Sequence, residues 1–272
     1  MEIIYLSFAG FIIAIRFFPP NEGSFPHVFK RDFFDFHGGM IIKNKGRKKI
    51  DYTIRVCDEN NIQIVRLPKA NRNLVHFYEN DDNRCLTTFY HVGIYQFQIV
   101  LRVVANKLLA KNRGFLLHGS TNLIHGKAHI FLARSGGGKS TIMELLNPEY
   151  EGIADDTIIA KNEGDSFYAY QTPFIERKSW IKKTPNRYEI GGIYFLHKKP
   201  EFSLNKIIKK NYLSERILKS VWFDIDFPRQ NVNRTIELVN KMDYFYDLTF
   251  AKNRKKLKGL MSETSQTRAS DL

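Results

Sequence analysis

The sequence predicts an α/β fold with a mostly β N-terminal subdomain and a helical C-terminal region. In residues 1–95, short β-branched and aromatic stretches alternate with turn residues. Between residues 128 and 146, an apolar strand, a glycine-rich loop and a helix follow one another. After Ser203, apolar residues recur at helical spacing, in Leu213–Val221 and Val232–Met242. We therefore expect three parts: residues 1–95, residues 96–261, and a polar, disordered tail at 262–272.

The chain begins with the apolar run Ile3–Ile15. This run predicts one or two β-strands that turn near Ala9 and Gly10. A membrane anchor is the alternative, but the run is too short to span a bilayer before Arg16 interrupts it. We expect no membrane association. The two cysteines of the 272 residues cannot form a disulfide framework, so we expect reduced thiols in a cytoplasmic protein.

The middle of the chain predicts a helix at Gln96–Lys111, followed by a strand at Phe115–Ser120 and a hairpin corner at Leu123–Lys127. A second strand, Ala128–Leu132, leads into the glycine-rich loop. Further strands are expected at Tyr168–Tyr170 and Ile193–Leu196.

The glycine-rich loop Ala133–Ser140 reads A-R-S-G-G-G-K-S, which fits the Walker A (P-loop) pattern except for Ala133 at the first glycine position. Glycines let backbone N–H groups surround phosphate oxygens, and the N-terminus of the following helix favours an anion. Lys139 can reach the β- and γ-phosphates, and the Ser140 hydroxyl can hold Mg²⁺. We therefore predict a nucleotide site whose members are Ser135, Gly136, Gly137, Gly138, Lys139, Ser140 and Thr141.

Asp155 and Asp156 follow Lys139 by sixteen and seventeen residues, at the end of an apolar stretch. Phosphoryl transfer needs a metal ion and a group that deprotonates or orients the acceptor hydroxyl. Two adjacent carboxylates could divide these tasks. The alternative is a pair of turn-forming aspartates.

These residues resemble the catalytic domain of HPr kinase/phosphorylase, a bacterial protein-serine kinase of the phosphoenolpyruvate-carboxykinase-like P-loop class. The resemblance covers residues 112–200 and rests on His118-Gly119 before the loop, on the loop itself, and on Ile153-Ala154-Asp155-Asp156 after it. A weaker match is Glu189-Ile190-Gly191-Gly192-Ile193.

The resemblance implies a role for each matched residue. Asp155 would be the general base for an acceptor serine, with His118 beside it. Ser140, with Asp156 or Glu189, would hold Mg²⁺. ATP would be the phosphate donor, and the chain would form a homo-oligomer as that family does.

The chain also departs from the family. Gly191 replaces the arginine of the family's E-x-R-G signature, and residues 1–90 do not resemble its regulatory domain. The chain is therefore more similar to the compact HPr-kinase-related proteins, whose acceptor is a hydroxyl of a peptide, a protein or a small molecule. The alternative function is a non-catalytic nucleotide-binding module that regulates partner docking.

The formal net charge of +14 has three interpretations: a solvated surface, a basic rim around a polyanionic substrate, or a nucleic-acid interface. The basic residues are scattered and no nucleic-acid motif accompanies them, so nucleic acid is not the expected partner. The basic segment Arg177–Lys183 fits a substrate-contacting loop or a surface loop equally well.

Overall fold

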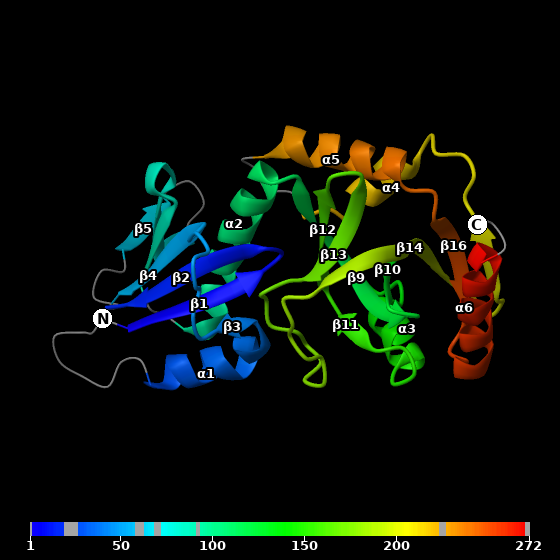
Figure 1. Ribbon diagram of the computed structural model, residues 1–272, viewed down its shortest axis with the longest axis horizontal. Coiled ribbons are helices and arrows are strands. Elements are labelled where there is room, and N and C mark those ends of the chain that lie inside the picture. The colour runs from blue at the N-terminus through cyan, green and yellow to red at the C-terminus, as the bar shows by residue number, and fades with distance from the viewer. Residues whose placement is uncertain are drawn as a thin grey trace. The chain divides into compact units, whose positions relative to one another are not determined.

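The computed structural model describes residues 2–18, 27–57, 63–67, 72–90, 93–222 and 227–269 (Figure 1). The chain forms two compact units. Unit 1 is Met1–Leu108 with Pro173–Ile175 and Lys183–Pro185, and unit 2 is Leu109–Thr172, Glu176–Lys182 and Asn186–Leu272. The division falls near the end of the helix Ile94–Lys111, later than the expected boundary at residue 95, because most of this helix belongs to unit 1, where its Phe97 packs on Phe89 of the sheet.

Unit 1 contains a six-stranded sheet in the order β3-β1-β2-β4-β8-β7 and a separate hairpin, β5-β6. Its elements are β1 (Glu2–Phe8), β2 (Phe11–Phe17), α1 (His27–His37), β3 (Ile41–Ile42), β4 (Tyr52–Cys57), β5 (Gln63–Leu67), β6 (Arg72–His76), β7 (Tyr78–Asp81), β8 (Leu86–Tyr90) and α2 (Ile94–Lys111). The apolar N-terminal run is the hairpin β1-β2, which turns at Ala9 and Gly10 with φ of 48° and 83°.

Aromatic rings hold the unit 1 helices on the sheet. Phe29 of α1 and Phe97 of α2 meet Phe89 of β8, at ring-centroid distances of 6.2 and 5.4 Å, and Phe33 of α1 packs on Phe29 and Phe97. The subdomain is mostly β, as the sequence predicts, but α1 was not expected.

Unit 2 contains strands in the order β10-β9-β12-β13-β14-β16-β15, with a further pairing of β10 to β14 and of β11 to β9. Its elements are β9 (Gly114–Ile124), β10 (Lys127–Leu132), α3 (Lys139–Leu146), β11 (Gly152–Ala154), β12 (Thr157–Glu163), β13 (Ser166–Gln171), β14 (Arg187–Lys198), β15 (Ser203–Lys206), α4 (Leu213–Leu218), α5 (Pro228–Lys241), β16 (Phe245–Phe250) and α6 (Arg254–Ala269). The mixed α/β class is thus confirmed.

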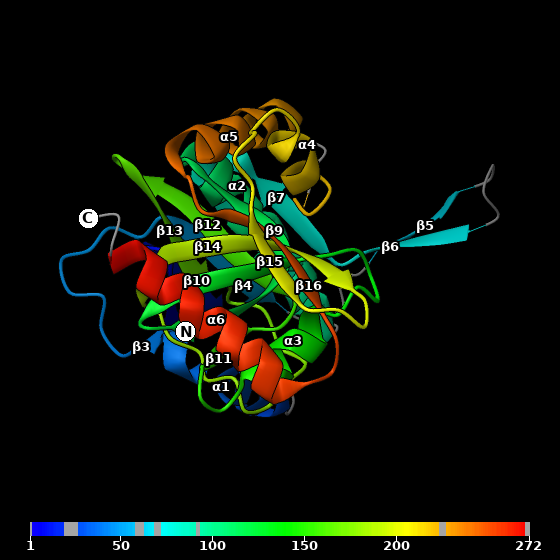
Figure 2. The ribbon, with the colours of Figure 1, turned by 90° about the vertical axis from the view of Figure 1, so that its right-hand side faces the viewer.

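Helices cover the unit 2 strands from two sides. Figure 2 shows α4 and α5 on one side and α3 and α6 on the other. The first pair buries Ile217 and Leu238, and the second buries Ile142 and Leu257. The apolar side chains buried between the helices and the strands on both sides stabilise the unit.

The C-terminal region differs from the expectation in two ways. It is not wholly helical, because β15 and β16 extend the sheet beside β14. α6 also continues through Ser262 to Ala269, where the sequence predicts a disordered tail; residues 270–272 lie outside the described part of the chain. Within the described residues, no helix combines the length and the apolar character needed to cross a lipid bilayer.

Candidate functional site

The glycine-rich loop connects the end of β10 to the start of α3. The Gly137 N–H donates to the Arg134 carbonyl at 3.0 Å, which closes the loop on itself. Gly138 has φ of 98°, a conformation that L side chains rarely adopt. A Cβ on Gly137 would lie 2.6 Å from the Cβ of Ala133. The loop therefore needs small residues here for steric reasons.

Lys139 is buried at the first turn of α3. Its Nζ donates to the Ala133 carbonyl at 2.9 Å, and its own carbonyl accepts from Ser120 Oγ at 2.8 Å. Burial lowers the pKa of Lys139, an effect that Asp156 opposes and Arg177 reinforces. The ammonium group is thus held against the loop, where the terminal phosphates of a nucleotide would lie.

The two aspartates follow β11 and differ in their surroundings. The Asp155 N–H donates to Glu176 Oε2 at 3.1 Å, and Asp155 Oδ1 accepts from the Arg177 N–H at 3.4 Å. Asp155 is only 3% exposed, and its Oδ2 has no hydrogen-bond partner among the described residues. A buried carboxylate oxygen without a hydrogen-bond partner is costly, so its place beside the glycine-rich loop requires a physical reason.

Asp156 is half-buried and faces the histidine. Its Oδ2 accepts from Thr157 Oγ1 at 3.1 Å, and its Oδ1 lies 3.5 Å from His118 Nδ1 and 3.9 Å from an Arg177 guanidinium nitrogen. The Asp156 carbonyl also accepts from the Gly119 N–H of β9, which fixes Asp156, and not Asp155 as expected, beside His118.

His118 is positioned by its own strand and by a neighbouring segment. Its backbone N–H donates to the Ser220 carbonyl at 2.6 Å, and its ring meets the Trp222 ring edge-on at a centroid distance of 5.8 Å. Burial, more than the nearby Lys139, lowers the pKa of His118, although Asp156 acts in the opposite direction. The ring is therefore neutral at pH 7.

These groups surround one cavity of about 200 Å³. Its lining consists of His118, Ser135, Gly136, Gly138, Lys139, Ser140, Thr141, Asp155, Asp156 and Arg177. The structure thus brings together all the predicted site residues except Gly137 and Glu189. Gly137 lines a neighbouring cavity that the loop also borders.

Glu189 does not lie at this site, contrary to the expectation of a metal ligand. β14 runs parallel to β10 with Ile190 opposite Ala128, so Glu189 lies beside the start of β10, whereas the loop follows its end. Its carboxylate accepts instead from Lys127 Nζ at 2.8 Å. Arg177 and Glu176 are at the site because the irregular segment that contains them lies next to Asp155. No spacing in the sequence indicates this position.

The residues present fit a magnesium–nucleotide complex. Among the described residues, no group of three or more His, Cys, Asp and Glu side chains could hold a metal ion. Mg²⁺ usually keeps several waters and is held by one or two protein oxygens together with substrate phosphates. Ser140 and Asp156 are hard oxygen donors of this kind, and the N-terminus of α3 lines the same cavity, where a helix terminus favours phosphate.

Comparisons with known proteins give matches among solved structures. No family model matches the chain, and no curated protein matches it in sequence. Among solved structures, the chain is similar to the Hpr(Ser) kinase/phosphatase from Coxiella burnetii, with 12% identity and a TM-score of 0.30. The match covers 57% of this chain and 97% of that one.

Proposed function

We propose that the chain is an ATP- and Mg²⁺-dependent kinase that transfers the γ-phosphate to a serine-type hydroxyl of a peptide, a protein or a small molecule. The observation that carries the proposal is the unpartnered Oδ2 of buried Asp155 in the same cavity as Lys139 and the glycine-rich loop. A buried carboxylate that lines the same cavity as a phosphate-binding loop is the pairing that phosphoryl transfer to a hydroxyl requires.

In the proposed reaction, the acceptor oxygen forms a bond to the γ-phosphorus and the bond from that phosphorus to the β-bridging oxygen breaks. The hydroxyl proton passes to the Asp155 carboxylate, and ADP leaves. Lys139 and the loop N–H groups hold the phosphate chain. His118 and Arg177 position the Asp156 carboxylate. Mg²⁺ held by Ser140 and Asp156 would neutralise charge on the phosphate oxygens.

Asp155→Asn tests the proposal because the amide keeps the shape of the carboxylate but cannot take the proton. We expect labelled phosphate transfer to acceptors in a host extract to fall by about a hundredfold or more, with ATP binding retained. The matched control is Asp165→Asn, which changes an exposed turn residue between β12 and β13. Transfer by Asp155→Asn at the wild-type rate would contradict the proposal.

A second variant separates binding from transfer. Lys139→Ala removes the ammonium group from the loop, so we expect weaker binding of Mg–ATP in calorimetry. If the wild-type chain binds Mg–ATP tightly but labels no acceptor, the regulatory nucleotide-binding module is the better assignment.

A further inference from the structure

A second cavity of about 410 Å³ lies beside the glycine-rich loop. β10 has β9 along one edge and β14 along the other. The aspartates are hydrogen-bonded to β9, and this second cavity is lined by the ends of β10 and β14, by Arg134 and Gly137 of the loop, and by Arg216, Lys219 and Ser220. The loop lines both cavities, and Ser220 of the larger cavity accepts from the backbone N–H of His118, which lines the smaller one.

The larger cavity is lined by Arg216, whose guanidinium group is held over an aromatic ring. The Arg216 guanidinium lies 3.8 Å from the ring centroid of Phe195. It also donates to both carboxylate oxygens of Asp247 on β16, at 2.5 and 3.3 Å. Asp247 accepts a third bond, from His197 Nε2 at 2.8 Å. Burial alone would raise the pKa of Asp247. The hydrogen bonds from Arg216 and His197 outweigh this effect, so the pKa of Asp247 is lowered.

This arrangement fixes the guanidinium plane before any ligand arrives. A guanidinium plane of this kind stacks on a nucleobase, and pre-organisation reduces the entropy lost on binding. Lys219 and Arg134 line the same cavity and add positive charge near its rim. The volume is within the range of small-molecule sites, about 300–1,000 Å³.

The direction of the nucleotide follows from the proposed function, on which this inference rests. The terminal phosphate must lie beside Asp155, and the loop binds the phosphate chain. The rest of the molecule must then leave the smaller cavity, and the larger cavity adjoins it along the loop. We propose that the nucleoside part of the nucleotide binds in this second cavity, with its base stacked on Arg216.

Binding of Mg–ATP and of magnesium tripolyphosphate, measured by calorimetry, tests this inference. The two probes share a triphosphate chain, but only ATP has a nucleoside. We expect Arg216→Ala to weaken ATP binding by about tenfold and to change tripolyphosphate binding by less than about twofold. Arg216→Lys keeps the charge but loses the plane, so it should lose a similar factor. The matched control is Arg229→Ala, an exposed arginine of α5.

Three results would overturn the inference. Wild-type protein could bind both probes while the Arg216 variants leave their affinity ratio unchanged, in which case the proposed function stands without this cavity. The variants could instead raise the KM for the acceptor with ATP affinity unchanged, which would show that the acceptor binds in this cavity. Wild-type protein that binds neither probe would remove the proposed function and this inference together.

Discussion

At the scale of single residues, His118 provides a test of the site's electrostatics. Because burial and Lys139 lower the pKa of His118, we expect it to titrate below the ordinary value of 6.5. Trp222 contacts its ring edge-on and can report the change, since a protonated imidazole quenches a neighbouring indole. The measurement is the pH dependence of Trp222 fluorescence in a Trp180→Phe background. His118→Asn should abolish the transition, and a midpoint above 6.5 would contradict the prediction.

His37 of unit 1 links pH to stability. It is fully buried, its Nδ1 lies 2.9 Å from the Phe33 carbonyl, and its Nε2 lies 3.2 Å from Gln98 Nε2. Burial lowers the pKa of His37 to about 4. Between pH 6.5 and 4 the unfolded chain binds a proton that the folded chain does not, so the free energy of unfolding falls as pH falls. The loss amounts to about 3 kcal/mol in total and is complete below pH 4.

Amide hydrogen exchange of β2 and β4 between pH 7 and 4.5 measures this effect. In His37→Gln, the component of the pH dependence that His37 causes should disappear. His76→Gln, which changes an exposed histidine, should keep the wild-type dependence. An unchanged pH dependence in His37→Gln would contradict the assignment.

Sequence spacing indicated most residues of the site, and its failures have physical causes. His118 lies on β9, which pairs with β10 before the loop and with β11 before the aspartates. Residues at these positions in the sequence are therefore brought together by the pairing of neighbouring strands. The position of Glu189 depends on the direction and register of β14, which no local pattern specifies. Arg177 lies on an irregular segment without any periodic signal.

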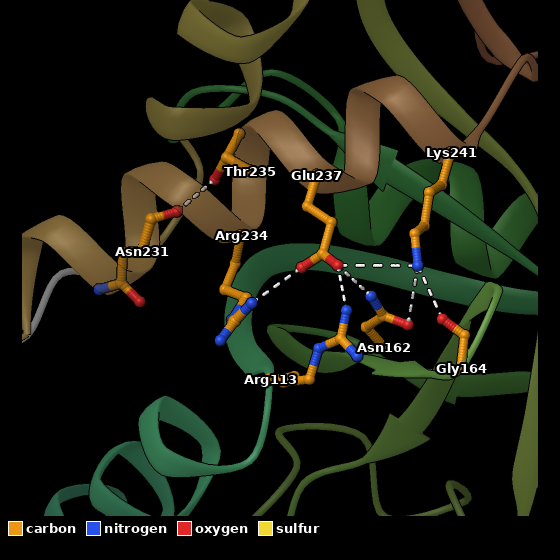
Figure 3. A network of polar contacts seen from close by, with 8 residues as sticks. All are labelled: Arg113, Asn162, Gly164, Asn231, Arg234, Thr235, Glu237 and Lys241. Carbon is orange, nitrogen blue, oxygen red and sulfur yellow. Dashed lines mark hydrogen bonds and ion pairs between the residues drawn. The ribbon is translucent and has the colours of Figure 1, made fainter.

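At the scale of elements, α5 is tied to the sheet by a polar network around Glu237 (Figure 3). One carboxylate oxygen accepts from Arg113 and Asn162, and the other accepts from Arg234 at 2.9 Å. Lys241 extends the network to the Gly164 carbonyl at 2.7 Å. Burial alone would raise the pKa of Glu237, but the bonds from Arg234 and Arg113 lower it.

Removing this carboxylate should loosen α5. Glu237 is 20% exposed, so water can replace only part of the network. We expect Glu237→Ala to lower the free energy of unfolding of unit 2 by about 2 kcal/mol, measured in urea, because several nitrogens lose a charged acceptor. Glu215→Ala on α4, where an exposed i,i+4 pair with Lys219 is lost, should have no measurable effect. Equal effects of the two variants would show that the network does not stabilise α5.

The elements that the sequence did not predict are those whose patterns are short or mixed. Phe245–Phe250 is a strand of six residues between two helices, and its alternation of buried and half-buried positions is too brief to outweigh the helical pattern around it. α1 has Phe29 and Phe33 one turn apart on its buried side, but the surrounding β-branched stretches favour strands. Long elements such as α2 and the β9-β10 hairpin were predicted correctly.

At the scale of the whole molecule, both cavities belong to unit 2, and so do both tryptophans of the chain, Trp180 and Trp222. Tryptophan fluorescence therefore follows the unfolding of the unit that contains the proposed site.

A ligand that binds only folded protein stabilises it in proportion to the logarithm of its concentration over Kd. Mg–ATP at a hundred times its Kd should raise the free energy of unfolding by about 2.7 kcal/mol in the fluorescence-detected transition. Lys139→Ala should show a smaller rise at the same concentration, because it binds the nucleotide more weakly. If Mg–ATP instead slowed amide exchange in the unit 1 sheet and left the tryptophan transition where it was, the nucleotide would bind outside the cavities described here, and both the glycine-rich loop and Arg216 would lose their proposed roles.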